Sequence, residues 1–286
     1  ELFYTLDQNL TLISGMKYTF NLKVNLTDVA NVGTEVDEWK PGEIINGGAS
    51  EELADKLLPK TITEEKFLQM AKIDFTYDAL NRVEKMIMEI SGTDPLLISI
   101  KRYEYEFKYS GSDSQIIGFE EKVYDGSTLI TPVLRDISEV DFVYGSGSVD
   151  LHYVSSAVDP DDGTITEYDS GVEPVSFTAD RDAVWAESVT AEIDDKFTPF
   201  EHINMDGWLR SYLLVSPYAL EGRALAAPVY SGKHNPIRIY SNGSTLYRNF
   251  TSTYNAKGYL LTSDAGKVES NGRPVHKRTV EYTAWK

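Results

Sequence analysis

The feature that most constrains the fold is a strict alternation of apolar and polar residues with a period of two. From Met16 to Leu26 every second residue is apolar, and the residues between them are lysine, threonine or asparagine. This period sends alternate side chains to opposite faces of an extended chain, so it predicts a strand with one buried face. The same alternation recurs at Ile73, Phe75 and Tyr77, at Met86, Met88 and Ile90, at Tyr103, Tyr105, Phe107 and Tyr109, and at Trp185, Glu187, Val189, Ala191 and Ile193.

Turn-forming residues separate the expected strands. The turn signals are Asp125-Gly126, Gly145-Ser146-Gly147, Asp162-Gly163, Asn242-Gly243 and Asn271-Gly272. Parallel strands would need helical stretches of about 10 to 15 residues between them, and the sequence shows no such pattern. The 18 tyrosines and 11 phenylalanines also favour pleated surfaces. We therefore predict an all-β, mainly antiparallel fold.

Residues 39–58 are expected to connect two parts of the chain. Trp39–Gly48 is rich in glycine, proline and asparagine, which is typical of a linker. Ser50–Leu58 has two leucines on one helical face and acidic residues in its first turn, and Pro59 would end it, so a short linker helix is expected. This places a front segment at residues 1–48 and a large β domain at residues 49–286.

A weak internal repeat joins two distant segments. Thr76–Val83 aligns with Thr253–Leu260, with Thr, Tyr, Ala and a final aliphatic residue in common. An Asp or Asn opens each turn through its side chain, and Asn81 or Gly258 adopts the left-handed conformation that reverses the strand. The alternative is two ordinary hairpins that share the same turn chemistry.

The charge balance and the absence of cysteine exclude several classes of partner and site. Lys and Arg number 27 against 45 Asp and Glu, a formal charge of -18, which disfavours nucleic acid as a partner. No stretch approaches the ~18 uninterrupted apolar residues of a membrane-spanning helix, so no transmembrane segment is expected. The chain has 0 cysteines, so it forms no disulfide and no thiolate metal site.

The motifs of common enzymes are missing from the sequence. The 4 histidines have no spacing that would place two metal ligands on one face. No Gly-x-Ser-x-Gly elbow or phosphate-binding loop occurs. Carboxylates are so numerous that no glycosidase pair can be chosen. We expect a protein that is not an enzyme and that needs no cofactor.

Two sets of residues are weak candidates for ligand or metal binding. The tryptophans Trp185, Trp208 and Trp285 are candidates for a platform that stacks on sugars, although aromatic residues on strands are more often core.

The acidic run at Asp159, Asp161 and Asp162 is a candidate calcium site. It lacks the alternating acidic spacing and the closing glutamate of a helix-loop-helix site, so a solvated hairpin tip is the favoured alternative.

Three segments occur in an order that resembles a known family. Thr76–Arg82, Asp194–Phe200 and Tyr254–Tyr259 are similar to segments of a family of secreted, lipid-anchored proteins of Gram-negative gut-type bacteria. The resemblance covers roughly residues 55–286. It implies a porin-like, strongly curved antiparallel sheet, as a large curved sheet or open barrel, but it brings no activity and no catalytic residues.

The front of the chain resembles a different module. Asn9–Val24, followed by Val36–Trp39, looks like the final strands of a fimbrillin domain, the pilin-like module of the same bacteria. The match spans about residues 8–48, far less than a whole domain, so the strands would complete a sheet with the rest of the chain or with another subunit, or the chain begins inside a longer protein. The alternative is an ordinary β-hairpin at the front of a single domain.

These resemblances imply a cell-surface or secreted protein of the bacterial envelope, lipid-anchored upstream of residue 1. The expected role is structural, in adhesion or in assembly, with other envelope or pilus subunits or a surface glycan as partner. A binding module for a glycan or small ligand is the alternative, and a polysaccharide hydrolase is a less favoured one. A membrane-embedded porin is disfavoured, because charged residues such as Lys17, Lys23 and Glu84 interleave with the apolar ones.

Overall fold

The computed structural model describes most of the chain, in two compact units. The described residues are 16–24, 29–38, 56–66, 69–92, 99–111, 114–127, 130–215, 223–266 and 276–285. The two units comprise residues 1–53 and 54–286. The boundary expected near residue 48 lies outside the described residues.

The described part of the first unit is an antiparallel hairpin. Strand β1 (Met16–Val24) pairs with β2 (Val29–Glu38) in a two-stranded sheet, so the strand expected from the alternating pattern is confirmed. The register shifts by one residue between Asn21 and Leu22. A two-stranded sheet alone is marginally stable in water.

The described residues of the second unit form the remaining strands and two short helices. They are β3 (Leu57–Lys66), β4 (Gln69–Tyr77), β5 (Val83–Gly92), β6 (Ser99–Tyr109), β7 (Ile116–Ser127), β8 (Ile130–Tyr144), β9 (Ser148–Val158), β10 (Ile165–Ser176), β11 (Thr190–Phe197), α1 (Gly207–Val215), α2 (Arg223–Tyr230), β12 (His234–Ser241), β13 (Thr245–Asn249), β14 (Thr251–Tyr254), β15 (Leu260–Asp264) and β16 (Lys277–Ala284).

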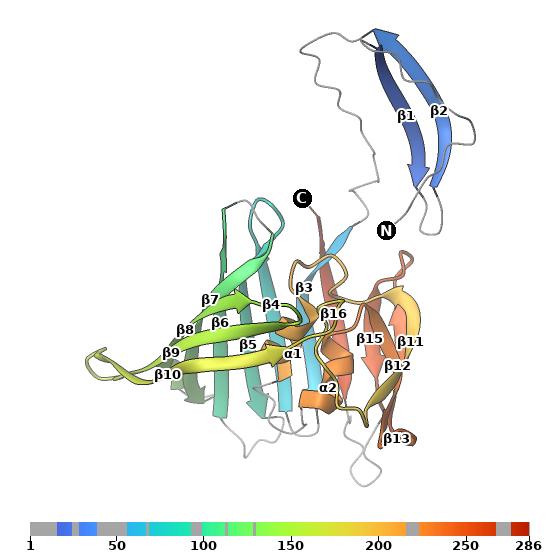
Figure 1. Cartoon of the computed structure of the whole chain (residues 1–286). Helices are drawn as coiled ribbons and strands as arrows, with labels where there is room; N and C mark the ends of the chain where they lie inside the picture. Colours follow the sequence, from blue (N-terminus) through green and yellow to red (C-terminus); the bar gives the residue numbers. More distant parts are fainter. Residues whose placement is uncertain are drawn as a thin grey trace. The chain divides into compact units, whose positions relative to one another are not determined.

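Eleven of these strands form one open antiparallel sheet. Its order is β10-β9-β8-β7-β6-β5-β4-β3-β16-β15-β14, so β3 to β10 follow one another as a meander, and the last strands of the chain extend the sheet beyond β3. Strands β10 and β14 are the two edges. A separate three-stranded sheet has the order β11-β12-β13. The all-β, mainly antiparallel fold with a large curved sheet is confirmed, and Figure 1 shows the curvature.

Helices α1 and α2 lie inside the curve of the sheet and complete the core (Figure 1). The main core joins inward residues of β3 to β9 with both helices, and Trp208 of α1 packs edge-on against Phe142 of β8 at 5.2 Å between ring centroids. A smaller core of Val189, Ile239 and Phe250 lies under the three-stranded sheet and contacts α2. Within the described ranges neither helix has the length and apolar character needed to cross a bilayer.

The prediction of a linker helix at Ser50–Leu58 is wrong where the structure describes it. Leu57 and Leu58 begin strand β3, and only Ser50–Asp55 lie outside the described residues. Leu58 is buried and pairs with Thr283 of β16, so pairing with a strand far away in the sequence outweighs the local helical pattern. Pro59 continues the strand instead of ending a helix, next to an irregularity in the register.

Two smaller expectations also differ from the structure. Asp125-Gly126 is not a turn, because both residues lie inside β7 and pair with neighbouring strands. The strand expected from Trp185 begins only at Thr190, after a turn in which the Val189 amide donates to the Ala186 carbonyl at 2.8 Å. The Asn271-Gly272 signal lies outside the described residues.

The hairpin turns of the internal repeat are confirmed in detail. The Asp78 amide donates to the Arg82 carbonyl, and the Asn255 amide donates to the Tyr259 carbonyl, both at 2.9 Å. In each turn the side-chain oxygen of the first residue accepts from two later backbone amides. Asn81 has φ of 58° and Gly258 has φ of 87°, as the turn requires.

A third turn of the same geometry was not expected from the sequence. The Thr178 amide donates to the Asp182 carbonyl at 2.9 Å, and the Arg181 amide donates to the Thr178 carbonyl at 2.8 Å. Arg181 occupies the left-handed position with φ of 62°. Its guanidinium stacks over Tyr144 at 4.6 Å and forms an ion pair with Asp206 at 3.2 Å, which offsets the strain of a side chain at this position.

We expect the substitution Gly258→Ala to lower the free energy of unfolding by about 1–2 kcal/mol, because L-residues resist the left-handed conformation. A steric clash does not explain this loss of stability, because an added Cβ would lie 3.8 Å from its nearest atom, Lys196 Cδ. Urea unfolding measures the change. Gly258→Asn is the control and should cost less, because asparagine adopts this conformation at position 81. Equal losses for the two variants would contradict the explanation.

Candidate ligand-binding site

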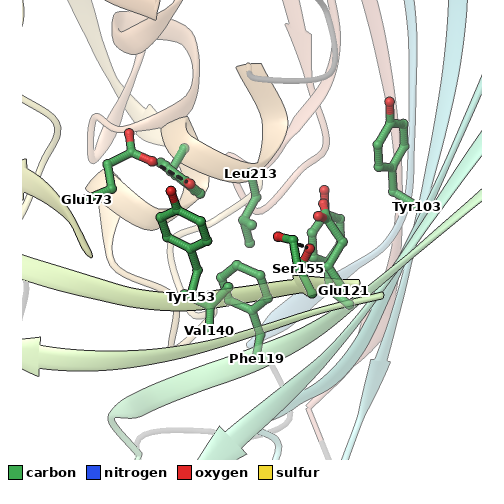
Figure 2. Close-up of a pocket in the computed structure, with 11 residues that line it drawn as sticks. Tyr103, Phe119, Glu121, Val140, Tyr153, Ser155, Glu173 and Leu213 are labelled. Carbon is green, nitrogen blue, oxygen red and sulfur yellow. Dashed lines mark hydrogen bonds between the residues drawn. The ribbon is translucent and has the colours of Figure 1, made fainter. Parts of the chain in front are cut away.

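A cavity of about 340 Å³ opens on the concave face of strands β6 to β10, where the C-terminal part of α1 approaches the sheet (Figure 2). The volume falls near the lower end of the ~300–1,000 Å³ range of small-molecule sites. The lining residues are Tyr103, Tyr105, Phe119, Glu121, Ser138, Val140, Tyr153, Ser155, Glu173, Tyr212 and Leu213.

The floor of the cavity is a row of polar residues that crosses the sheet. Strand pairing places Tyr105 beside Glu121, Glu121 beside Ser138, and Ser138 beside Ser155. The row ends on the edge strand β10 with Asp169, which pairs with Ser155. Because directly opposed residues in a sheet share one face, these side chains all lie on the concave side.

A parallel row of mainly apolar residues lies next to the polar row. It runs through Phe107, Phe119, Val140, Tyr153 and Gly171, one from each strand. A Cβ on Gly171 would lie 3.0 Å from the Tyr153 hydroxyl oxygen, so the glycine leaves room for the tyrosine ring at the sheet edge. The cavity therefore lies where the close-packed core changes to a polar surface.

Glu121 is a half-buried acid on the floor of the cavity. Burial raises the pKa of Glu121, the nearby carboxylate of Asp136 raises it further, and a hydrogen bond with Tyr105 opposes the rise. Burial also raises the pKa of the Tyr105 hydroxyl well above its ordinary value, so that hydroxyl remains a donor. Glu121 is therefore a carboxylate held in a site that disfavours its charge.

Other polar groups around the cavity are paired across elements. The Tyr212 hydroxyl of α1 donates to the Glu173 carboxylate of β10 at 3.0 Å, and the hydroxyls of Ser138 and Ser155 lie 2.9 Å apart. Figure 2 shows the Tyr153 ring between Glu173 and the cavity floor. Among the lining residues that the structure describes, none is lysine, arginine or histidine. The cavity offers aromatic planes, hydroxyls and two carboxylates to a ligand.

The structure places the three candidate tryptophans apart from one another and outside this cavity. Trp208 is 1% exposed and packs in the main core. Trp185 donates its Nε1 hydrogen to the Ser231 hydroxyl at 3.2 Å, and Trp285 packs edge-on against His202. In the described ranges no ring contact joins two of the three, and their binding role stays a prediction.

The acidic candidates lie at the tip of the β9–β10 hairpin. The Asp159 carboxylate accepts from the Asp161 amide, and the Asp162 carboxylate accepts from the Thr164 amide, both at 2.8 Å. Two of the three carboxylates thus accept hydrogen bonds that stabilise the turn. No group of three or more His, Asp or Glu that could hold a metal ion occurs among the residues that the structure describes. A calcium role for Asp159, Asp161 and Asp162 stays a prediction without geometric support.

Two further cavities, of about 230 and 200 Å³, lie beside Arg181 and Asp206. Polar side chains that line them form hydrogen bonds that stabilise the fold. In the first, the Asn204 side chain accepts from the Val83 amide at 2.9 Å and donates to two other groups. In the second, the buried Arg210 donates to three backbone carbonyls at 2.5–2.8 Å. We therefore do not select either as the ligand site.

The residues of the concave cavity were not predicted from the sequence, although a signal exists. Inward positions of β7 read Phe119, Glu121 and Val123, so a glutamate interrupts an otherwise apolar face. Ser138 and Ser155 interrupt the inward faces of β8 and β9 in the same way. Only the strand register shows that the three interruptions meet.

We expect Glu121→Gln to raise the free energy of unfolding at neutral pH by about 0.5–1 kcal/mol, and to leave it unchanged below pH 4. The raised pKa means that the folded state keeps a proton above pH 4.5 that the unfolded state releases, so wild-type stability falls as the pH rises through this window. Urea unfolding across pH measures this. Glu139→Gln removes a 64% exposed carboxyl from the outer face of β8 and is the control, with an expected change in the free energy of unfolding within about 0.5 kcal/mol at pH 7. A destabilised Glu121→Gln at neutral pH would contradict the explanation.

Comparison with known proteins gives little further information. No family model matches the sequence. No curated protein matches it significantly. One solved structure with some likeness is a porin-like protein from Bacteroides uniformis, at 11% sequence identity and a TM-score of 0.29, covering 79% of this chain and 97% of that chain. A TM-score this low carries no argument about fold or function, and the resemblances to the lipid-anchored family and to fimbrillin stay predictions.

Proposed function

We propose that this chain is a non-enzymatic binding protein that holds a small polyhydroxylated ligand, such as a unit of a glycan, in the concave cavity. The observation that carries the proposal is the adjacency of the two rows: aromatic rings line the cavity beside hydroxyls and carboxylates. Aromatic planes suit the apolar faces of sugar rings, and the polar row suits their hydroxyl groups. Binding of a sugar requires aromatic planes and polar groups within the same cavity.

The cellular location that belongs to this function is the outside of the cell, with lipid anchoring upstream of residue 1 and a role in adhesion. This part of the proposal rests on the resemblance to secreted, lipid-anchored proteins. A surface glycan is the partner that agrees with both the resemblance and the cavity.

The test is a glycan array followed by calorimetry on the full chain. We expect binding that weakens about tenfold or more in Tyr153→Ala, which removes one aromatic wall. Tyr247→Ala is the matched control, because Tyr247 is 39% exposed and does not line the cavity. No array signal, or equal binding by both variants, would contradict the proposal. Cleavage of a bound oligosaccharide would contradict its non-enzymatic part and favour a hydrolase.

A second candidate function is assembly with other subunits through the front hairpin. Strands β1 and β2 form a sheet of two strands that pair only with each other among the described strands. Such a sheet has unpaired edges and gains stability when a further strand pairs with it. Envelope or pilus subunits would be the partners.

Sedimentation velocity of residues 1–286 beside residues 49–286 tests the assembly role. Self-association of the longer chain over a concentration series, with a monomeric shorter chain, is the expected result. Monomers with equal thermal unfolding would remove the assembly role and leave the cavity as the functional site.

A further inference from the structure

We infer that the concave cavity binds the end of a glycan chain, and that the rest of the chain leaves across the edge strand β10 beside Tyr168. This inference rests on the proposed function and specifies which part of a glycan is recognised. Three features of the described residues support it: the graded burial of the polar row, a β-bulge at the open end of that row, and a hydrogen bond that connects α1 to β10.

The polar row is closed at its β6 end. Tyr105 of β6 pairs with Met86 of β5, and Met86 pairs with Phe75 of β4. Tyr105 is 2% exposed and Met86 is 0% exposed, so the row continues into the main core, where close-packed side chains fill the space. A glycan that follows the row toward β6 must therefore end beside Tyr105 and Glu121.

The other end of the polar row, at β10, is open. Glu121, Ser138 and Ser155 are half-buried, and Asp169 of β10 is exposed. Strand β10 pairs only with β9 among the described strands, so no further strand of the sheet covers this edge. Exposure therefore increases along the row from β6 to β10, and a chain held by the row leaves at the β10 edge.

A β-bulge places an exposed tyrosine at this open end. The register of β10 against β9 shifts between Glu167 and Asp169, so Tyr168 is the extra residue, and such bulges redirect side chains. Burial and the Asp136 carboxylate raise the pKa of the Tyr168 hydroxyl, and a hydrogen bond with Ser155, which lines the cavity, opposes the rise. Tyr168 is nevertheless 61% exposed. Its ring therefore offers an aromatic face to the unit that follows the terminal one.

The contact between α1 and β10 narrows the exit. The Tyr212 hydroxyl donates to the Glu173 carboxylate at 3.0 Å and connects the helix to the edge strand (Figure 2). Asp169 lies further along the same face of β10, toward the bulge. The Tyr153 hydroxyl lies 3.4 Å from the Asp169 carboxylate, so the aromatic wall extends to this part of the edge. The chain leaves past Tyr153 and Tyr168.

Polysaccharides of two lengths test whether chain ends are recognised. The probes are linear chains of α-1,6-glucose, α-1,6-mannose and β-2,6-fructose, and any further array glycan that binds enters the same comparison. Calorimetry on the full-length protein measures how many protein molecules bind per gram of each probe. In a fraction about five times longer, this capacity should fall about fivefold, because longer chains carry fewer ends per gram. Equal capacity in both fractions would show that internal segments bind.

One variant and one control test the exit across β10. The measured quantity is the gain in affinity from the monosaccharide to the trisaccharide of a sugar that binds, so a change in binding of the first unit cancels. This gain should fall about threefold or more in Tyr168→Ala. Ile165→Ala is the matched control and should retain the gain. Ile165 lies on the same strand, is 60% exposed, and pairs with Val158 on the outer face of the sheet.

The outcomes distinguish failure of this inference from failure of the proposed function. Equal capacity of the short and long fractions would overturn the recognition of chain ends. A gain that Ile165→Ala lowers as much as Tyr168→Ala, or that neither variant lowers, would overturn the exit across β10. In each of these cases the cavity remains a glycan site. Absence of binding by all three polysaccharides and by every array glycan would overturn both the inference and the binding function.

Discussion

Replacing Glu64 with alanine is expected to lower the free energy of unfolding by about 3–5 kcal/mol, the usual cost of removing one partner of a buried ion pair. Glu64 on β3 is fully buried and lies opposite Arg278 on β16. The Arg278 Nε donates to the Glu64 carboxylate at 2.7 Å, and the Tyr230 hydroxyl of α2 also donates to it. Lys66 Nζ lies 4.0 Å away. The substitution leaves two buried cations without this carboxylate.

The pH dependence of Glu64 has a defined sign. Burial alone would raise the pKa of Glu64, but the charge of Arg278, with His276 and Lys66, holds it well below its ordinary value of 4.5. Its contribution is therefore present above pH 4.5 and is lost as the pH falls through the lower folded-state pKa. The penalty of Glu64→Ala should shrink in the same acidic range.

Glu65→Ala is the matched control for this prediction. Glu65 is the next residue on β3, its side chain is 40% exposed, and it lies 4.0 Å from Lys277. Exposed ion pairs contribute little, so its loss should stay within about 1 kcal/mol. Urea unfolding at pH 7 measures both variants. Similar losses for Glu64→Ala and Glu65→Ala would show that the buried pair does not stabilise the junction of β3, β16 and α2.

Trp208→Ala is the second large effect, with an expected loss of about 3–5 kcal/mol from the cavity that the substitution creates. Trp208 packs edge-on against Phe142 and Tyr144 and stacks with Phe177 at 6.4 Å. The Trp208 ring connects α1 to β8 and to Phe177, the residue after β10, so its removal should loosen the helix that borders the concave cavity.

The same variant also tests the sugar-stacking role expected of this tryptophan. Urea unfolding and glycan binding should be measured on Trp208→Ala beside Trp185→Ala, whose half-buried ring makes one hydrogen bond to Ser231 and should cost less. A large loss of affinity with unchanged stability in Trp208→Ala would contradict its place in the core and restore the binding role.

The sequence by itself determined the class of fold and the local geometry of its turns. Alternation of apolar and polar residues specifies a strand at Met16–Val24 and strands with one buried face in β4 and β5, because side-chain direction has a period of two along any strand. The turn residues Asp78 and Asn255 act through atoms only a few residues away, so the hairpins at both ends of the repeat were predictable.

Tertiary structure alone decided the elements that depend on distant partners. The residues before Leu57 and Leu58 have a helical sequence pattern, but both leucines pair with β16. In α2 the local sequence opposes a helix, because Pro228 lies inside it. Ala226, Ala227 and Tyr230 are buried, so packing of α2 against the curved sheet stabilises the helix.

The lining of the concave cavity also depends on residues that are distant in the sequence. Glu121, Ser138 and Ser155 each interrupt a strand's apolar face, and only the register of β7, β8 and β9 brings the three together. Glu64 and Arg278 meet in the same way across 214 residues of sequence. Local sequence patterns determine which secondary structures a segment can form, because they act through atoms of neighbouring residues. Which segments meet is set by burial and pairing over the whole chain, and that decides both the helices and the site.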